Sequence, residues 1–367
     1  MSLQCGIVGL PNVGKSTLFN ALTESSVPAE NYPFCTIEPH LGIVSLPDAR
    51  LNELGNIYNP KKIIPATVEF TDIAGLVRGA SKGEGLGNQF LGQIRQTSAI
   101  IHVVRCFENA NVTHVDGSVD PIRDAETIET ELLLADLETL EKRQHKTEKI
   151  ARSGSKEAIN ELALIERLTK HCSDGKQART IALSDSEKDI LLSFHLLTNK
   201  PILYIANVDE NDILQSETQN QYVKELSDYA KKENNYTIRI CASIEQEIAI
   251  LPPAEKKMFL EEYNLSEPGL HKVIRSSFDL LGLQTYFTCG EEEVRAWTVS
   301  KESSAPEAAG EIHTDFKRGF IKAEVFHYND IMAFGSEKLL SEAGLIRQEG
   351  KQYIVKDGDC IFFKFNV

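Results

Sequence analysis

The residues with the clearest chemistry lie close to the N-terminus. Residues 9–17 read Gly-Leu-Pro-Asn-Val-Gly-Lys-Ser-Thr, which is the G-x-x-x-x-G-K-[ST] pattern with an apolar stretch before it and a helix-forming stretch after it. Its glycines allow a tight turn whose N–H groups converge on phosphates at a helix N-terminus. In this pattern Lys15 reaches the β- and γ-phosphates and Ser16 ligates Mg²⁺. The sequence therefore predicts that the chain binds a nucleoside triphosphate together with Mg²⁺.

Two further segments carry groups suited to the same site. Asp72-Ile73-Ala74-Gly75 follows an apolar run at residues 66–70, so that the Asp72 carboxylate can hold the metal and the Gly75 N–H can contact the γ-phosphate. Thr36 is expected in a loop between the first predicted helix and the second predicted strand, from which its hydroxyl could close onto Mg²⁺. Ser16, Thr36 and Asp72 are the predicted Mg²⁺ ligands.

The segment that would read the base departs from the GTPase pattern. GTPases of this type carry Asn-Lys-x-Asp after the strand predicted at residues 201–206, whereas this chain has Asn207-Val208-Asp209-Glu210. Glu210 takes the place of the aspartate with an extra methylene, and Val208 replaces the lysine. A displaced acceptor leaves guanine N–H groups unpaired, which costs about 1–3 kcal/mol. Because Asn207 can still bond a purine, including adenine, the sequence predicts weakened guanine preference and use of ATP.

The hydrolysis machinery also departs from the pattern. The glutamine that orients water in Ras-type enzymes would follow Gly75, but this chain has Leu76, which neither donates nor accepts. His114, in the loop at residues 109–115, is the candidate replacement, since an imidazole can orient water or donate to the γ-phosphate. The predicted catalytic residues are His114, Lys15 and Gly75. The predicted nucleotide-binding residues are Asn12, Val13, Gly14, Lys15, Ser16, Thr17, Asn207, Val208, Glu210 and Ser243.

Whole-chain properties limit the classes of protein. The chain has 367 residues, enough for two or three domains, with 41% hydrophobic and 25% charged residues. It contains no apolar run long enough to span a membrane, and the first residues lead straight into the phosphate-binding pattern, so no signal peptide is expected. The seven cysteines are scattered without a C-x-x-C pair, as reduced thiols of a cytoplasmic protein would be. The net charge of −15 argues against indiscriminate nucleic-acid binding.

The hydrophobic pattern indicates an α/β fold with an insertion. Short apolar runs predict the buried strands of a mostly parallel sheet with helices on both faces; they lie at residues 42–46, 66–70, 99–104, 201–206 and 237–242. Leucines at helical spacing after Glu126, a break at residues 153–155 and a second helical pattern predict an antiparallel helical hairpin at about 126–195. Its tip is the most basic stretch of the chain, which fits either a solvated face or a contact with RNA or an acidic partner.

The C-terminal part has a different pattern. Short strands are predicted at residues 286–288, 296–299, 353–355 and 360–365, around a helical stretch near 329–343. We expect a P-loop domain over residues 1–280 and a separate α+β domain over residues 281–367.

These residues identify a family resemblance. The chain resembles the YchF/Obg-like ATPases, a branch of the translation-factor class of P-loop GTPases, along its whole length. The resemblance rests on residues 9–17, 31–39 and 72–88, on the altered base motif at 207–210, and on the Asp357-Gly358-Asp359 ending. It implies an ATP-preferring, Mg²⁺-dependent hydrolase with a coiled-coil insertion and a C-terminal TGS domain of the ubiquitin-like β-grasp fold.

The resemblance also implies partners and roles for single residues. The family is associated with ribosome binding and with oxidative-stress responses, which implies a molecular switch in translation or a stress response. The ribosome or ribosomal RNA is the expected partner of a monomer that binds neither membranes nor DNA. The family's histidine in the loop of His114 is regarded as the substitute for the missing glutamine, and Asn12 matches the asparagine by which potassium-activated relatives bind K⁺. Two alternatives stay open: a GTPase of the Obg type that tolerates the altered motif, and a nucleotide-stabilised binding scaffold with incidental hydrolysis.

Overall fold

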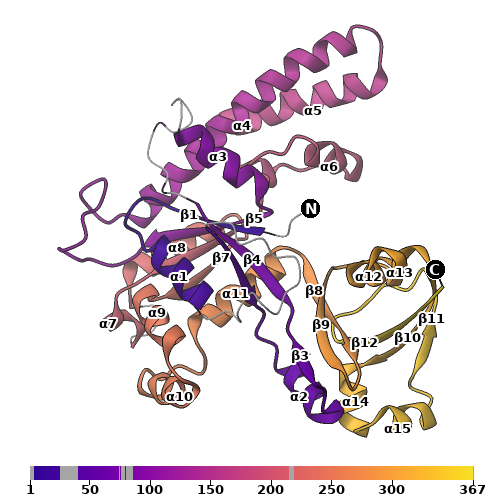
Figure 1. Ribbon diagram of the computed structural model, residues 1–367. Coiled ribbons are helices and arrows are strands. Elements are labelled where there is room, and N and C mark those ends of the chain that lie inside the picture. The colour runs from indigo at the N-terminus through magenta and orange to yellow at the C-terminus, as the bar shows by residue number, and fades with distance from the viewer. Residues whose placement is uncertain are drawn as a thin grey trace. The chain divides into compact units, whose positions relative to one another are not determined.

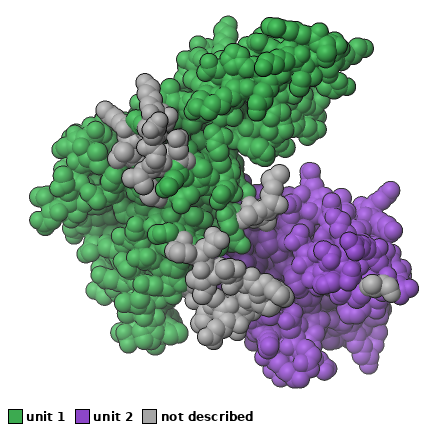
Figure 2. Space-filling view, turned by 45° about the horizontal axis from the view of Figure 1, so that its top comes forward, with its two compact units in different colours: residues 1–42, 69–273 green, residues 43–68, 274–367 purple. Residues whose placement is uncertain are grey.

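The computed structural model describes residues 4–24, 40–73, 75, 79, 86–214 and 219–366. The chain divides into two compact units: residues 1–42 and 69–273 form the first, and residues 43–68 and 274–367 form the second (Figure 2). These units are defined by contacts within the structure and do not test the domains predicted at residues 1–280 and 281–367, which stay predictions. Thr36 and Leu76 lie outside the described residues.

The first sheet is the predicted α/β core (Figure 1). Its strand order is β2-β4-β1-β5-β6-β7, and β1 pairs in parallel with both β4 and β5, as β6 does with β5 and β7. Every residue of β5 and β6 is buried, as expected for inner strands of a parallel sheet. The strands are β1 (Gln4–Val8), β2 (Leu41–Ser45), β4 (Thr67–Asp72), β5 (Ala99–Arg105), β6 (Ile202–Asn207) and β7 (Tyr236–Ile240).

Helices connect these strands, and several of them pack against the sheet. They are α1 (Lys15–Glu24), α3 (Leu86–Gln96), α7 (Glu210–Ile213), α8 (Gln221–Lys231), α9 (Ala242–Ile250), α10 (Pro253–Glu262) and α11 (Gly269–Leu280). The predicted strand at 237–242 is too long, because Cys241 is the N-cap of α9.

The predicted helical hairpin is present and projects away from the sheet (Figure 1). It consists of α4 (Pro121–Ala151) and α5 (Lys156–Ser173), followed by a short 3₁₀ turn (Ala178–Thr180) and α6 (Asp185–Leu192). Asp120 caps α4 by accepting the Arg123 N–H, and Ser155 caps α5 by accepting the Ala158 N–H. Buried leucines and isoleucines between the helices form the hairpin's own core, which explains the spacing seen in the sequence.

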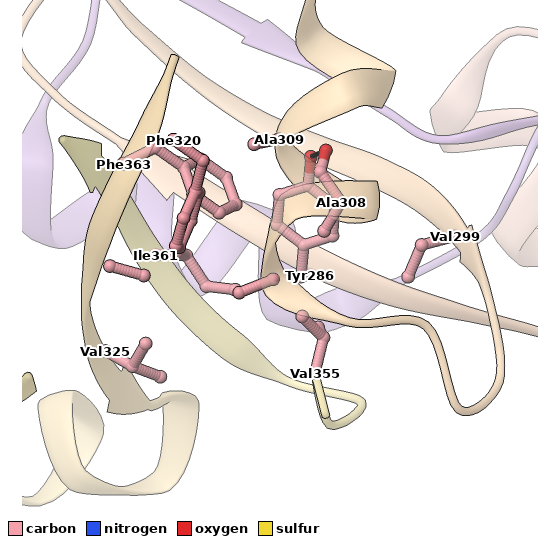
Figure 3. Close-up of a cluster of buried hydrophobic side chains, with 11 residues drawn as sticks. Tyr286, Val299, Ala308, Ala309, Phe320, Val325, Val355, Ile361 and Phe363 are labelled. Atoms are coloured by element: carbon pink, nitrogen blue, oxygen red, sulfur yellow. Dashed lines mark hydrogen bonds between the residues drawn. The ribbon is translucent and has the colours of Figure 1, made fainter. Parts of the chain in front are cut away.

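The second unit is built on a separate sheet with the order β11-β10-β12-β8-β9-β3. Its strands are β3 (Lys62–Ile64), β8 (Leu283–Cys289), β9 (Glu293–Ser300), β10 (Phe320–His327), β11 (Arg347–Glu349) and β12 (Asp359–Phe365). Its helices are α2 (Ala49–Tyr58), α12 (Ala305–Ile312), α13 (Thr314–Arg318), α14 (Tyr328–Phe334) and α15 (Glu337–Glu342). Figure 3 shows side chains from β8, β10, β12 and α12 converging on one core, where the buried Tyr286 hydroxyl donates to the Ala308 carbonyl over 2.8 Å.

The sequence-based description of this unit differs from the structure in several places. The strand predicted at 353–355 is only an isolated bridge between Ser304 and Ile354, and β10 was missed. The helical stretch predicted near 329–343 is two helices, because Gly335 ends α14 in the left-handed conformation with φ 76°. Residues 62–64 join this sheet through parallel pairing of β3 with β9. This pairing is long-range and cannot be predicted from a local sequence pattern.

Two whole-chain expectations can be compared with the described residues. Within the described ranges, no helix is both long and apolar enough to cross a bilayer. The six cysteines that the structure describes are all free thiols.

Candidate nucleotide-binding site

The phosphate-binding loop connects β1 to α1. Close contacts explain why glycine occupies two of its positions. Gly14 has φ 97°, and a Cβ there would lie 2.3 Å from Nδ2 of Asn207. A Cβ on Gly9 would lie 2.4 Å from the carbonyl oxygen of Val103. Side chains at either position would force the loop away from the sheet. The loop therefore presents its backbone at the N-terminus of α1, as a phosphate cradle requires.

Lys15 is a buried cation at the start of α1. Its Nζ donates to the carbonyl oxygen of Leu10 over 2.7 Å, so the ammonium group is held inside the loop. Burial lowers the pKa of Lys15 to about 8, and the charge of Asp72 acts in the opposite direction. A triphosphate placed in the loop would favour the charged form of this lysine.

Ser16 and Asp72 form a pair that fits a divalent cation. Ser16 Oγ donates to Asp72 Oδ2 over 3.2 Å, while Asp72 Oδ1 is buried and has no hydrogen-bond partner among the residues that the structure describes. Oxygen donors of this kind suit Mg²⁺, and an unpaired buried carboxylate oxygen is a place where a hydrated cation would be favourable. The third predicted ligand, Thr36, falls outside the described ranges.

Gly75 lies against the same lysine. A Cβ on Gly75 would lie 3.1 Å from Lys15 Nζ and 3.3 Å from Pro11 Cγ. Gly75, three residues beyond the end of β4, thus comes close to the phosphate-binding loop, although the two are far apart in the sequence. Lys15, Ser16, Asp72 and Gly75 are brought together as the sequence predicted.

A cavity of about 580 Å³ adjoins the loop, within the usual size range of small-molecule sites. It collects seven residues predicted to bind nucleotide, namely Asn12, Gly14, Thr17, Asn207, Val208, Glu210 and Ser243. Its remaining lining residues are Phe107, Asn109, Val112, Asp209 and Ala242. The altered base motif therefore lies beside the phosphate-binding loop, in a cavity of suitable size for a nucleoside.

Asn207 has a role that sequence reasoning did not assign. Its Nδ2 donates to the carbonyl oxygen of Val13 over 2.9 Å, and its Oδ1 accepts the N–H of Ala242 over 3.0 Å. The side chain is buried and ties the phosphate-binding loop to the start of α9. Only one amide hydrogen remains for a base, so Asn207 acts mainly as a positioning residue in this structure.

Sequence reasoning named the loop at residues 109–115 for His114 but missed that Phe107, Asn109 and Val112 line the cavity. Arg105, buried at the end of β5, donates to the carbonyl oxygens of Phe107, Asn109 and Val112 over 3.0–3.2 Å, and its guanidinium lies 4.6 Å from the Phe107 ring centroid. One cation therefore organises the loop that carries Phe107 and Asn109. The signal available in the sequence was an arginine at the end of an otherwise apolar strand.

His114 lies in the continuation of this loop. Asn12 Nδ2 donates to the carbonyl oxygen of Thr113 over 3.3 Å, so the residue before His114 contacts the phosphate-binding loop. The ring itself is buried: Nδ1 accepts the Asp116 N–H over 3.1 Å, and Nε2 lies 2.8 Å from Asp124 Oδ2. Both ring nitrogens are thus occupied by protein groups, and neither is free to orient water in this conformation.

Comparisons with known proteins identify similar sequences and a similar solved structure. A family model described as "50S ribosome-binding GTPase" matches residues 4–136, and the C-terminal model of YchF GTPases, described as a protein of unknown function, matches residues 283–366. Curated relatives named "Ribosome-binding ATPase YchF" include those of Bacillus subtilis, 53% identical, and Haemophilus influenzae, 52% identical, each covering 100% of both chains. The solved structure of the Schizosaccharomyces pombe YchF GTPase is 39% identical and covers 99% of this chain and 98% of that one, with a TM-score of 0.90.

Proposed function

The chain belongs to the YchF family, and from that premise we propose that it is a Mg²⁺-dependent nucleoside triphosphate hydrolase that prefers ATP to GTP and works at the ribosome. The proposal is supported mainly by one observation. Close together, beside the cavity that the altered base motif lines, lie Lys15, Ser16, Asp72 and Gly75. Phosphates would lie on the loop and the base in the cavity.

The proposed preference for ATP rests on the residues of the base motif. Val208 is buried and offers no cation to lie along a base. Glu210 is exposed at the start of α7, one methylene longer than the aspartate that accepts guanine. Asn207 keeps one amide hydrogen, which suits an acceptor such as adenine N7. The features at Val208 and Glu210 act against guanine, while the Asn207 amide can donate to N7 of either purine.

The cofactors of the proposal are Mg²⁺ and, at a second position, K⁺. Ser16, Asp72 and Thr36 would hold Mg²⁺, which neutralises charge on the phosphates when it is bound. Asn12 has φ 63° and uses its amide nitrogen on Thr113, so its side-chain oxygen is the atom we assign to K⁺. His114 would assist the attacking water after its ring leaves Asp124.

The proposed contact with the ribosome is the tip of the helical hairpin. Lys146, Lys149, Arg152 and Lys156 are exposed there, beside the exposed Ile150 and Ile159. Phosphate contacts need exposed cations of this kind. Arg143 does not belong to this surface, because it donates to Glu161 over 2.7 Å and lies 4.3 Å from the Phe194 ring centroid. We further propose that the protein is a cytoplasmic monomer.

The proposal is tested by steady-state hydrolysis of ATP and GTP, with Mg²⁺ or EDTA, and by co-sedimentation with purified bacterial ribosomes. We expect a higher kcat/KM for ATP, activity that requires Mg²⁺, and weaker co-sedimentation of a Lys149→Glu/Arg152→Glu variant. A Lys224→Glu/Lys231→Glu variant makes the same charge change on α8 and should co-sediment as the wild type does. A higher kcat/KM for GTP would favour the Obg-type GTPase, and equal co-sedimentation of both variants would remove the tip from the interface.

A further inference from the structure

Helix α4 contacts two segments of the nucleotide site through buried carboxylates. Asp124 Oδ2 lies 2.8 Å from His114 Nε2, and Glu131 Oε1 accepts the backbone N–H of Gly79 over 2.6 Å. Gly79 follows Gly75 closely in the chain. Positions seven residues apart lie on one face of a helix, two turns apart. The same helix therefore contacts both the ring of His114 and the backbone of Gly79.

Both nitrogens of the His114 ring are engaged when Nε2 contacts Asp124. Because Nδ1 accepts the Asp116 N–H, the ring proton of the neutral form is on Nε2 and is donated to Asp124. Asp124 is 2% exposed, and its other oxygen accepts from Arg123 Nη2 over 3.1 Å. A charge-assisted hydrogen bond between two buried side chains is among the stronger ones in proteins. His114 must break it before the ring can meet water or the γ-phosphate.

The same helix continues to the tip of the hairpin. It has 31 residues and is therefore about 45 Å long at 1.5 Å per residue. Between its two ends it is anchored at Glu129 and Asp136. Glu129 accepts from the Tyr204 and Tyr229 hydroxyls and from Gln177 Nε2, and Asp136 accepts from the Thr198 hydroxyl and two backbone N–H groups. A helix fixed in the middle converts a displacement of one end into a displacement of the other.

We propose that α4 couples the hairpin to hydrolysis: Asp124 holds His114 in an inactive position, Glu131 holds the Gly79 backbone, and displacement of α4 frees the histidine. Asp124 and Glu131 are positioning residues, because they act through His114 and Gly79. The proposal rests on the proposed role of His114 in hydrolysis and gives that site a means of regulation.

The first test is the turnover of an Asp124→Asn variant. Replacing the charged acceptor by a neutral one weakens its hold on the ring, so we expect kcat for ATP to rise about five- to tenfold while KM stays within twofold. The rise should disappear in the Asp124→Asn/His114→Ala double variant. Glu126→Gln removes a charge at an exposed position of the same helix, leaves Asp124 in place, and should behave as the wild type does.

The outcomes separate the two claims. If His114→Ala alone leaves kcat unchanged, the proposed role of His114 is wrong. If His114→Ala lowers kcat but Asp124→Asn leaves it unchanged or lowers it, only the inhibitory role of Asp124 is overturned.

The second test does not depend on catalysis. Hydrogen–deuterium exchange of residues 142–158 is measured with and without a non-hydrolysable ATP analogue. We expect the analogue to change exchange at the tip in the wild type, and the change to be at least halved in Glu131→Ala; Glu131→Gln serves if the alanine variant has a lowered melting temperature. Glu126→Gln, at an exposed position of α4, should keep the wild-type response. An equal response in the Glu131 variant, or no response in the wild type, would overturn the coupling.

Discussion

The amide nitrogen of Asn207 donates to the carbonyl oxygen of Val13 over 2.9 Å, so the motif that follows β6 also supports the phosphate-binding loop. Its amide oxygen accepts the Ala242 N–H, which fixes the start of α9 at the same point. Three segments that are distant in the sequence therefore meet at one buried side chain. A single residue contributes to the geometry of both the phosphate and the base parts of the site.

This relationship predicts the effect of Asn207→Ala. Loss of the side chain leaves the Val13 carbonyl and the Ala242 N–H unpaired, which costs about 1–3 kcal/mol each and loosens the loop for any nucleotide. We expect affinities for ATP and GTP to fall together, about 10- to 100-fold, with their ratio changed less than twofold. Fluorescent-analogue titration measures both. A loss confined to ATP would instead make Asn207 the residue that reads adenine.

Lys15 predicts a pH dependence of nucleotide binding. Its pKa without nucleotide is about 8 because of burial, and bound phosphates raise it. Above pH 8 the free protein has lost a proton that the complex keeps, so binding takes up a proton. The affinity for ATP should therefore fall as pH rises from 8 to 9.5, approaching about tenfold per pH unit. Lys15→Arg stays charged throughout and should lose this slope; a flat wild-type profile would contradict the prediction.

The pair of Ser16 and Asp72 predicts a specific loss of Mg²⁺ dependence. With the Asp72 carboxylate made neutral in Asp72→Asn, the metal loses its charged oxygen donor. We expect the gain in ATP affinity on adding Mg²⁺ to shrink about tenfold, while affinity in EDTA changes little. Asp189→Asn, an exposed residue of α6, is the matched control and should keep the full response. Calorimetry with and without Mg²⁺ measures it.

Asp136 predicts a large effect on stability. It is 0% exposed and accepts hydrogen bonds from the Leu197 and Thr198 N–H groups and from the Thr198 hydroxyl, over 2.7–2.8 Å. Asp136→Ala leaves these donors unpaired and should cost about 3 kcal/mol, which lowers the melting temperature by about 6–12 °C. Glu138→Ala, two residues away and exposed, should shift it by less than about 2 °C. Similar shifts for both variants would contradict this assignment.

Local patterns in the sequence were sufficient for the first sheet and the hairpin. The strands around the phosphate-binding loop are short apolar runs, and Leu133, Leu140 and Leu168 are spaced for a shared helical core. Their partners are near in sequence or set by the usual order of parallel strands. The proximity of Lys15, Asp72 and Gly75 could be predicted because these residues follow neighbouring strands of the parallel sheet.

Other features depend on long-range contacts that a local pattern does not contain. The pairing of β3 with β9 joins residues 62–64 to a sheet formed more than two hundred residues later. The Nε2 atom of His114 is engaged by Asp124 in the next helix. The side chain of Asn207 is held by hydrogen bonds to the backbones of Val13 and Ala242. His114 and Asn207 were singled out from the sequence and residues 62–64 were not. In all three cases the interacting partner became known only from the structure.

The central claim is that the cavity formed by Asn207-Val208-Asp209-Glu210 and the phosphate-binding loop prefers adenine. The most direct measurement is equilibrium binding of non-hydrolysable ATP and GTP analogues, side by side, with Mg²⁺ and K⁺ present, to the wild type and to Glu210→Asp. We predict tighter binding of the ATP analogue to the wild type and a reduced preference in Glu210→Asp, whose shorter side chain suits guanine better. Tighter binding of the GTP analogue to the wild type would contradict the account and show that Glu210 still accepts guanine.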